Sequence, residues 1–246
     1  MKNYKAVIQY DGSGFFGFQV QRAQNCRTVQ KELEAAFGKI FGHQVRIIPS
    51  GRTDRGVHAK AQVISFKTDT IIPQERLKDI LNNALSDDIK IVSIRKTLDN
   101  FHACHLAKSK TYRYFIDTSL NPDIFVRNYI WQIRHELDAD VMQRAASLLI
   151  GRHDFSSFAL NASSYKDCIR TVLDISVRRT GAKIAISVIG DGFLHGMVRN
   201  IVAVLVQAGK GNLTVQGVKN ILSAENRSSF GHSAPACGLY LWKVRY

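Results

Sequence analysis

The chain has 246 residues, 45% of them hydrophobic, which is enough for one large domain or two small ones and excludes an intrinsically disordered protein. It carries 34 Lys and Arg residues against 20 Asp and Glu, and the resulting net charge of +14 indicates a polyanionic partner, nucleic acid before membrane. The basic residues are spread along the whole chain rather than gathered in a tail, which predicts a basic folded face.

The first hundred residues predict the element order β-α-β-β-α-β. Residues 5–10 form a strand that places on one side Ala6, Ile8 and Tyr10. Thr28 can cap a helix whose apolar residues recur at four-residue spacing, namely Val29, Leu33, Phe37 and Phe41. Pro73 opens a second helix, with one apolar stripe made of Leu77, Leu81 and Leu85. We expect further strands at residues 44–49, 62–68 and 89–95.

The second half predicts the same order of elements. Residues 110–117 form a strand with one side made of Tyr112, Tyr114 and Ile116. Asp138 can cap a helix that Gly151 ends. We then expect two strands, a strongly apolar helix, a short helix and a final strand, at residues 169–178, 183–189, 194–208, 214–223 and 239–246.

This repeated order predicts an α+β fold of two tandem ferredoxin-like or RRM-like βαββαβ units with antiparallel sheets. We place the first unit at residues 1–104 and the second at residues 105–246. Two such sheets joined around a central cleft would form an RNA-binding site, and the loop that carries Asp54 could point into it.

The cysteines and the chain's start indicate a cytoplasmic protein. Cys26, Cys104, Cys168 and Cys237 are far apart, without C-x-x-C or zinc-finger spacing, so we expect free thiols in a reducing compartment and no metal site. We see no signal peptide, because residues 1–4 lead straight into a strand. No apolar run approaches the length of a membrane span, so we expect no membrane partner.

Residues 50–59 are the stretch most suggestive of chemistry. Asp54 stands between the guanidiniums of Arg52 and Arg55 in a glycine-containing loop between two expected strands. A carboxylate with a cation nearby stays ionised, so Asp54 could act as a nucleophile or base while the arginines hold phosphates. The alternative is a surface aspartate in an Asx turn next to Gly56.

Two further residues stand out beside that loop. Tyr112 lies on a strand face where tyrosines can stack bases, although such rings can also belong to the core. Arg199 stands in the first turns of the apolar helix, where a buried arginine is costly unless it is paired. Its candidate partner is Asp54, and the alternative is that Arg199 extends to solvent.

The sequence GRTDRGVHA of residues 51–59 resembles the signature of the TruA family of tRNA pseudouridine synthases. By this resemblance Asp54 matches the family's catalytic aspartate. Residues 110–114, KTYRY, are similar to the family's K-x-Y-x-Y strand, which places the active-site tyrosine at Tyr112. Residues 193–202 resemble the segment whose arginine pairs with the catalytic aspartate, so Arg199 is its match and Phe193 and Leu194 would shape the base pocket.

Three other segments carry the resemblance, in the order and spacing of the family. They are residues 10–21, 100–105 and 152–158. In isolation the first is a turn followed by an aromatic loop. In the second, Cys104 stands where many relatives carry arginine, which removes a phosphate contact and leaves one detail of RNA placement open.

The resemblance implies an isomerase that converts uridine to pseudouridine in the anticodon stem-loop of tRNA, without cofactor or metal. It also implies a homodimer and a target base that leaves its stem to enter the cleft. The residues expected to contact RNA are Arg52, Arg55, His58, Tyr112, Phe193 and Leu194.

Two alternatives remain open at this point. A non-catalytic tandem RRM-like RNA-binding protein would explain the charge and the tyrosines. It would not explain a carboxylate among arginines, because an acidic group there repels phosphate. The second alternative keeps the enzyme and changes its substrate to another structured RNA.

Overall fold

The computed structural model describes residues 1–21, 26–224 and 232–246, which form two compact units. The first unit comprises residues 1–108 together with 241–246, and the second comprises residues 109–240. The last six residues therefore group with the first unit, whereas the predicted domains, residues 1–104 and 105–246, divide the chain once. That division stays a prediction.

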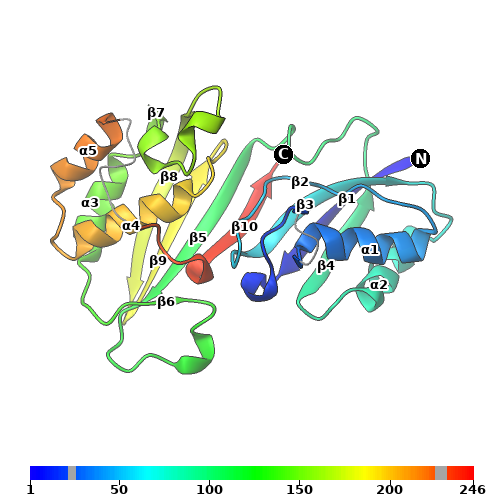
Figure 1. Cartoon of the computed structure of the whole chain (residues 1–246), viewed down its shortest axis with the longest axis horizontal. Coiled ribbons are helices and arrows are strands. Elements are labelled where there is room, and N and C mark those ends of the chain that lie inside the picture. The colour runs from blue at the N-terminus through cyan, green and yellow to red at the C-terminus, as the bar shows by residue number, and fades with distance from the viewer. Residues whose placement is uncertain (22–25, 225–231) are drawn as a thin grey trace. The chain divides into compact units, whose positions relative to one another are not determined.

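The first unit has the predicted order β-α-β-β-α-β (Figure 1). Its elements are β1 (Lys2–Tyr10), α1 (Val29–Phe41), β2 (Ile48–Pro49), β3 (His58–Thr68), α2 (Gln74–Ala84) and β4 (Ile89–Lys96). The strands lie in the order β4-β1-β3, with β2 also paired to β3, and each of these pairs is antiparallel. This is the strand order of a ferredoxin-like unit, as the sequence indicated.

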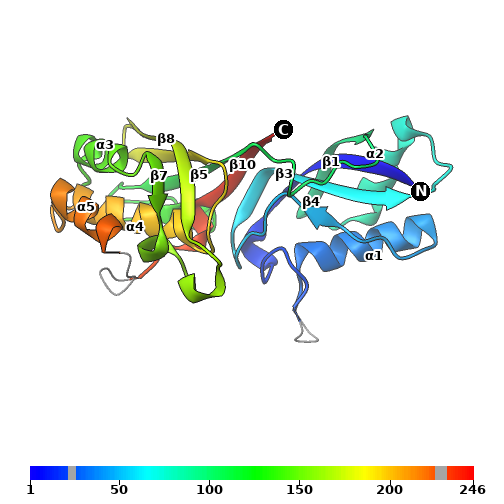
Figure 2. The same ribbon diagram turned by 90° about the horizontal axis from the view of Figure 1, so that it is seen from above.

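The core of the first unit lies between the sheet and its helices. On β1 the predicted residues Ala6 and Ile8 are fully buried, and on α1 so are Val29, Leu33 and Phe37. Figure 2 shows α1 along one face of this sheet. The side chain of Thr28 accepts a hydrogen bond from the amide of Lys31, so the predicted cap begins the helix.

Two predicted strands of this unit have different bounds in the structure. Only Ile48–Pro49 of the expected strand 44–49 pairs with β3, because the amide of Ile47 donates instead to the Glu34 carboxylate, at 3.0 Å. In contrast, β3 begins at His58 rather than at residue 62. The loop that carries Asp54 is therefore short, since it is confined between Pro49 and His58.

The second unit also contains the β-α-β-β-α-β order, with additional short elements. It comprises β5 (Ser109–Asp117), β6 (Trp131–Gln132), α3 (Ala139–Ser147), β7 (Gly151–Asp154), β8 (Ile169–Thr180), β9 (Lys183–Gly190), α4 (Met197–Gly209), α5 (Val215–Ser223) and the start of β10 (Leu239–Arg245). Its strands lie in the order β5-β9-β8-β7, and β6 runs parallel to β5. The sequence did not predict β6 or β7.

Helix α3 ends earlier than expected. The Asp138 carboxylate caps its start, accepting from the amides of Asp140 and Val141 at 2.9 Å each. The helix ends at Ser147, and Gly151, which has a φ of +119°, begins β7 instead of ending the helix. Residues 152–158, one of the segments that carry the family resemblance, thus begin as an edge strand.

Helix α4 starts at Met197, three residues later than the sequence predicted. Gly196 precedes it with a φ of +72°, a left-handed conformation that cannot continue a right-handed helix backward to Leu194. From Met197 on, the helix is buried on nearly every side, as its apolar sequence indicated. Within the described part of the chain, no helix is both long and apolar enough to span a membrane.

Candidate functional site

The loop that carries Asp54 is held at its base by β3. The side chain of Gln62 is fully buried, and its Oε1 accepts from the Ser50 hydroxyl at 2.6 Å while its Nε2 donates to the Gly51 carbonyl at 2.7 Å. Within the loop, the Val57 amide donates to the Asp54 carbonyl at 3.1 Å. Asp54 itself is half-buried. Because these hydrogen bonds fix the backbone of the loop, its carboxylate has a defined place at the surface of the unit.

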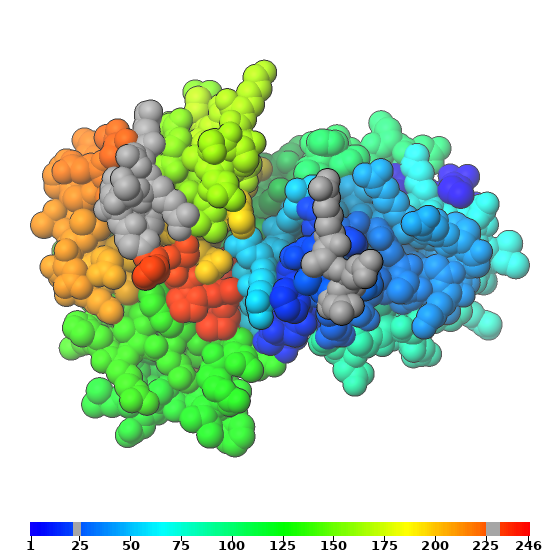
Figure 3. Space-filling view, in the orientation of Figure 1, coloured from blue at the N-terminus to red at the C-terminus, as the bar shows by residue number. Residues whose placement is uncertain are grey.

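The opening segment, defined as residues 10–21, clamps this loop from the other side. The Phe18 amide donates to the Thr53 carbonyl at 3.0 Å, and the buried Tyr10 hydroxyl lies 2.8 Å from the Thr53 hydroxyl. Gly17 has a φ of +96°, and a Cβ there would lie 2.9 Å from the Thr53 carbonyl oxygen. Figure 3 shows the two segments side by side on the surface. The sequence located the opening segment but not its contacts with the loop that carries Asp54.

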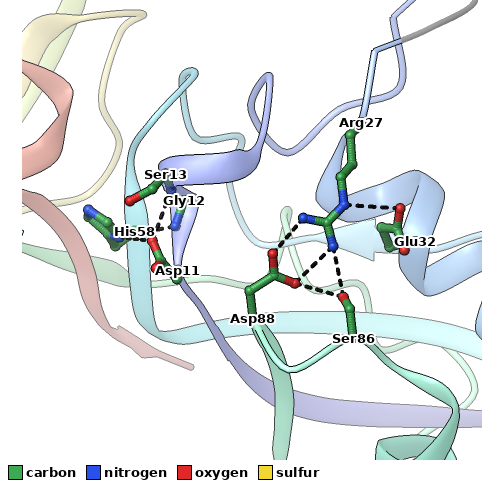
Figure 4. A network of polar contacts seen from close by, with 8 residues as sticks. All are labelled: Asp11, Gly12, Ser13, Arg27, Glu32, His58, Ser86 and Asp88. Atoms are coloured by element: carbon green, nitrogen blue, oxygen red, sulfur yellow. Dashed lines mark hydrogen bonds and ion pairs between the residues drawn. The ribbon is translucent and has the colours of Figure 1, made fainter. Parts of the chain in front are cut away.

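His58 is buried at the first position of β3, with only 2% of its surface exposed. Its Nδ1 lies 3.0 Å from the Gly12 amide and 3.2 Å from the Asp11 carboxylate (Figure 4). Only an unprotonated Nδ1 can accept from Gly12, and only a protonated one can donate to Asp11. We assign the bond to Gly12, because a peptide amide always carries its hydrogen. His58 thereby fixes the opening segment, and its contact with RNA stays a prediction.

An ion pair between Arg27 and Asp88 fixes the chain just before α1. The Arg27 guanidinium makes two bonds to the Asp88 carboxylate, at 2.5 and 2.9 Å, and also contacts Ser86 and Glu32 (Figure 4). Burial by itself would raise the pKa of Asp88, but the hydrogen bonds from Arg27 and Ser86 outweigh it and the pKa is lowered. The guanidinium also stacks on the Phe15 ring, 4.3 Å from its centroid. The residues before α1 are thus tied to the turn before β4.

Tyr112 lies on β5 in the second unit. Its side chain is 7% exposed, and its ring meets the Phe193 ring edge-on, with the centroids 5.2 Å apart. Gly190 makes room for Phe193, because a Cβ at that position would lie 2.9 Å from the tip of the ring. Leu194, the next residue, is buried. Three predicted site residues therefore gather at the end of β9 and the approach to α4.

Arg199 is half-buried in the first turn of α4. Its Nε donates to the Ala234 carbonyl at 2.7 Å, and its own carbonyl accepts from the Ala234 amide at 3.2 Å. The next residue, Asn200, is fully buried and bonds through its side chain to the Phe158 carbonyl and the Ser233 hydroxyl. The bond from its Nε to the Ala234 carbonyl thus orients the Arg199 side chain.

Ala234 and Ser233, which make these bonds to Arg199 and Asn200, belong to a strap defined as residues 233–238. The Tyr114 hydroxyl donates to the Pro235 carbonyl at 2.7 Å, and Gly238 packs so closely that a Cβ would lie 2.6 Å from the Tyr114 ring. Burial raises the pKa values of the Tyr114 phenol and the Cys237 thiol, while nearby Arg199 acts to lower both. Sequence analysis missed this strap. Pro235 and Gly238, ahead of the last strand, were the available signal.

The predicted site residues are divided between the two units. The first unit holds Arg52, Asp54, Arg55 and His58, and the second holds Tyr112, Phe193, Leu194 and Arg199. The predicted ion pair of Asp54 with Arg199 and the predicted central cleft stay predictions. Among the residues that the structure describes, no three His, Cys, Asp or Glu side chains are grouped to hold a metal ion.

The first unit by itself presents a carboxylate flanked by two exposed guanidiniums. Exposed guanidiniums bind phosphates and stack on bases, whereas a lone carboxylate repels a nucleic-acid backbone. A carboxylate in that position is costly for binding unless it takes part in chemistry. The second unit presents a tyrosine ring in a hydrophobic setting and an oriented arginine.

Comparison with known proteins matches a family model described as tRNA pseudouridine synthase, over residues 6–105 and 145–246. A relative named tRNA pseudouridine synthase A from Brevibacillus brevis is 42% identical over 246 residues and 100% of both chains. One of the same name from Acetivibrio thermocellus is 41% identical over 246 residues and 100% of both chains. One from Bacillus pumilus is 41% identical over 244 residues and 98% of each. The residues matched to the family model contain every predicted site residue except Tyr112.

Proposed function

We propose that this chain, which belongs to the tRNA pseudouridine synthase family, isomerises uridine to pseudouridine in tRNA with Asp54 as the catalytic carboxylate. Membership of the family makes the chain an isomerase. The observation that carries the role of Asp54 is its place on a loop clamped from both sides and flanked by Arg52 and Arg55.

The reaction rearranges bonds within one nucleotide. The bond from N1 of uracil to C1′ of the ribose breaks, the base rotates, and a new bond joins C5 to C1′. The C5 proton is lost and N1 gains one, so no oxidant, reductant or group donor is consumed. A single ionised carboxylate can assist this sequence, by attack on C1′ or C6 or by removing a ribose proton.

The other predicted residues have supporting roles in this proposal. Arg199 is the cationic partner that orients the Asp54 carboxylate. Tyr112 stacks on the base and helps move the C5 proton, and Phe193 and Leu194 shape the base pocket. Support for these roles comes from the contact of Tyr112 with Phe193 and from the bond that holds the Arg199 Nε.

We further propose that the target uridine lies in the anticodon stem-loop and is flipped out of its stem to reach Asp54. Flipping costs a few kcal/mol, which stacking on Tyr112 and basic contacts to the backbone offset. The enzyme works in the cytoplasm as a homodimer, without a metal or cofactor. The net charge of +14 supports a tRNA partner.

The test is tritium release from a tRNA transcript labelled at C5 of uridine, with the wild type and Asp54→Asn compared side by side. Uridine and pseudouridine have the same mass, so loss of the C5 hydrogen is the direct signal. We expect release by the wild type and a loss of at least about a thousandfold in the variant, because the substitution removes the reacting charge.

Equilibrium binding of the same tRNA provides the control. Asp54→Asn should bind tRNA at least as well as the wild type, because it removes a negative charge from an RNA-facing loop. Release by Asp54→Asn at the wild-type rate would eliminate Asp54 as the catalytic group. Binding without release by the wild type would favour the RNA-binding alternative.

A further inference from the structure

Arg55 and Phe16 form a cation–π pair directly beside Asp54. The carbon at the centre of the Arg55 guanidinium lies 4.2 Å from the centroid of the Phe16 ring. Arg55 is exposed, and Phe16 is among the exposed large hydrophobic residues, with 37% of its surface accessible. This exposed aromatic ring beside the candidate catalytic residue offers an apolar contact to a ligand.

The backbone on both sides of the pair is fixed. The Phe16 amide donates to the Arg27 carbonyl at 2.9 Å, and the Phe16 carbonyl accepts from the side chain of Gln21 at 2.7 Å. On the other side, the Gly56 amide donates to the Phe15 carbonyl at 3.3 Å. The pair is therefore preorganised, and a ligand that uses it does not have to order it first.

The position of the Arg55 guanidinium over the Phe16 ring fits one class of ligand. A guanidinium stacked on a ring turns one face to the ring and leaves the opposite face for another planar group. Unpaired nucleobases stack on aromatic rings and on arginine planes. Among the ion pairs of the described residues none involves Arg55, so its charge is not committed to a carboxylate within the chain.

We propose that Arg55 and Phe16 form a stacking platform for an unpaired base that neighbours the target uridine in the RNA. The inference rests on the proposed function and deepens it, because it gives the loop a second subsite next to the reacting base. Arg55 acts there through its plane and not only as a phosphate contact. The platform thereby holds the RNA strand open beside the flipped uridine.

The experiment separates the plane of Arg55 from its charge. Arg55→Lys keeps the positive charge and loses the planar group, and Phe16→Ala removes the ring beneath it. Arg46→Lys, a matched change at another exposed arginine of the same unit, is the control. Each variant is combined with Asp54→Asn, so that binding is measured without turnover, and its thermal melting is compared with that of the parent.

The probe is a tRNA that releases tritium with the wild type, carrying 2-aminopurine at each position next to the modified uridine in turn. Stacking quenches 2-aminopurine fluorescence. We expect quenching at one of these positions with the parent and with Arg46→Lys. We expect weaker quenching and roughly tenfold weaker binding with Arg55→Lys and with Phe16→Ala, the range for loss of one stacked base.

Two results overturn the platform while leaving the proposed function intact. One is tritium release by the wild type together with parental binding and quenching in Arg55→Lys, which would make Arg55 a point charge. The other is parental quenching and binding in a folded Phe16→Ala. Absence of tritium release by the wild type from every tRNA tested is a separate result, and it removes both proposals together.

Discussion

Three tyrosines, the buried Tyr10 and Tyr114 and the half-buried Tyr246, join distant parts of the chain through their hydroxyl groups. The Tyr10 hydroxyl bonds to Thr53 in the loop that carries Asp54, and the Tyr114 hydroxyl bonds to Pro235 in the strap. The Tyr246 hydroxyl donates to the Ala103 carbonyl at 2.7 Å. In all three, burial raises the pKa of the phenol, because a phenolate would lose its hydration. These residues are neutral connectors, and their contribution to stability depends on pH only in alkaline solution.

Tyr10 gives the clearest prediction at this scale. Burial raises its pKa to about 12 from an ordinary value of 10.0. Below pH 10 the phenol is neutral in the folded and unfolded chains alike, so its stabilisation is fully present. As the pH rises from about 10 to about 12 only the unfolded chain loses the proton, and the free energy of unfolding falls by up to about 3 kcal/mol.

Tyr10→Phe should remove that part of the alkaline loss and cost about 1 kcal/mol near neutral pH, because the Thr53 hydroxyl loses its partner. Urea unfolding at a series of pH values between 7 and 12 measures both effects. The same fall in stability above pH 10 in wild type and variant would show that Tyr10 is not the titrating group. A double-mutant cycle with Thr53→Val isolates the hydroxyl pair.

At the scale of elements, irregular segments position the candidate site. Strand β5 presents Tyr112 and helix α4 presents Arg199, but the opening segment and the strap fix the surrounding geometry. A strand or helix satisfies its own backbone bonds, whereas a loop must find partners elsewhere in the fold. Here the loop that carries Asp54 finds them in the opening segment.

The start of α4 gives a prediction at this scale. Gly196 and Gly211 have nearly equal φ values, +72° and +77°, but a Cβ at Gly196 would lie 2.6 Å from the Leu160 side chain, whereas nothing lies within 4 Å of one at Gly211. Gly211→Ala should cost about 1 kcal/mol for the left-handed backbone. Gly196→Ala should cost a further ~1–3 kcal/mol, because the new methyl group overpacks the site.

Urea unfolding of the two variants measures this difference, and tritium release reports its effect on the site. We expect Gly196→Ala to lower the rate as well, since Arg199 lies in the first turn of the displaced helix. Equal destabilisation by both substitutions would mean that Leu160 moves aside without cost. In that event backbone conformation alone, and not packing, sets the start of α4.

At the scale of the whole molecule, we expect the net charge of +14 to strengthen association with RNA. Each phosphate contact made by Lys or Arg releases counterions, so the affinity for RNA falls as salt rises. Arg52→Gln should weaken tRNA binding and reduce the slope of log affinity against log salt by about one, as loss of one phosphate contact does.

Lys78→Gln is the matched control for this prediction. Lys78 lies on α2, where its ammonium group is 3.6 Å from the Asp79 carboxylate and is therefore already paired. Filter binding of tRNA from low to high potassium chloride gives the slopes. An unchanged slope for Arg52→Gln would remove Arg52 from the phosphate contacts and leave the remaining basic residues to account for binding.

The sequence by itself determined the type and order of the longer helices and strands, although it did not predict the short strands β6 and β7. The capping residues Thr28 and Asp138, the alternation of Tyr112 and Tyr114, and the four-residue spacing on α1 are local patterns, and the structure confirms them. The net charge and the residue types around Asp54 also follow from composition and local sequence alone. They indicated a nucleic-acid enzyme, and the family match shows a tRNA pseudouridine synthase.

Only the tertiary structure decided how the two halves of the candidate site are supported. The bonds of Tyr10 and Phe18 to Thr53, and of Arg199 to Ala234, join residues more than thirty positions apart. Periodicity reports which face of an element is buried, but it carries no information on which distant loop satisfies a given carbonyl or hydroxyl. The clamp on Asp54 and the strap on Arg199 therefore emerged only when the chain was folded.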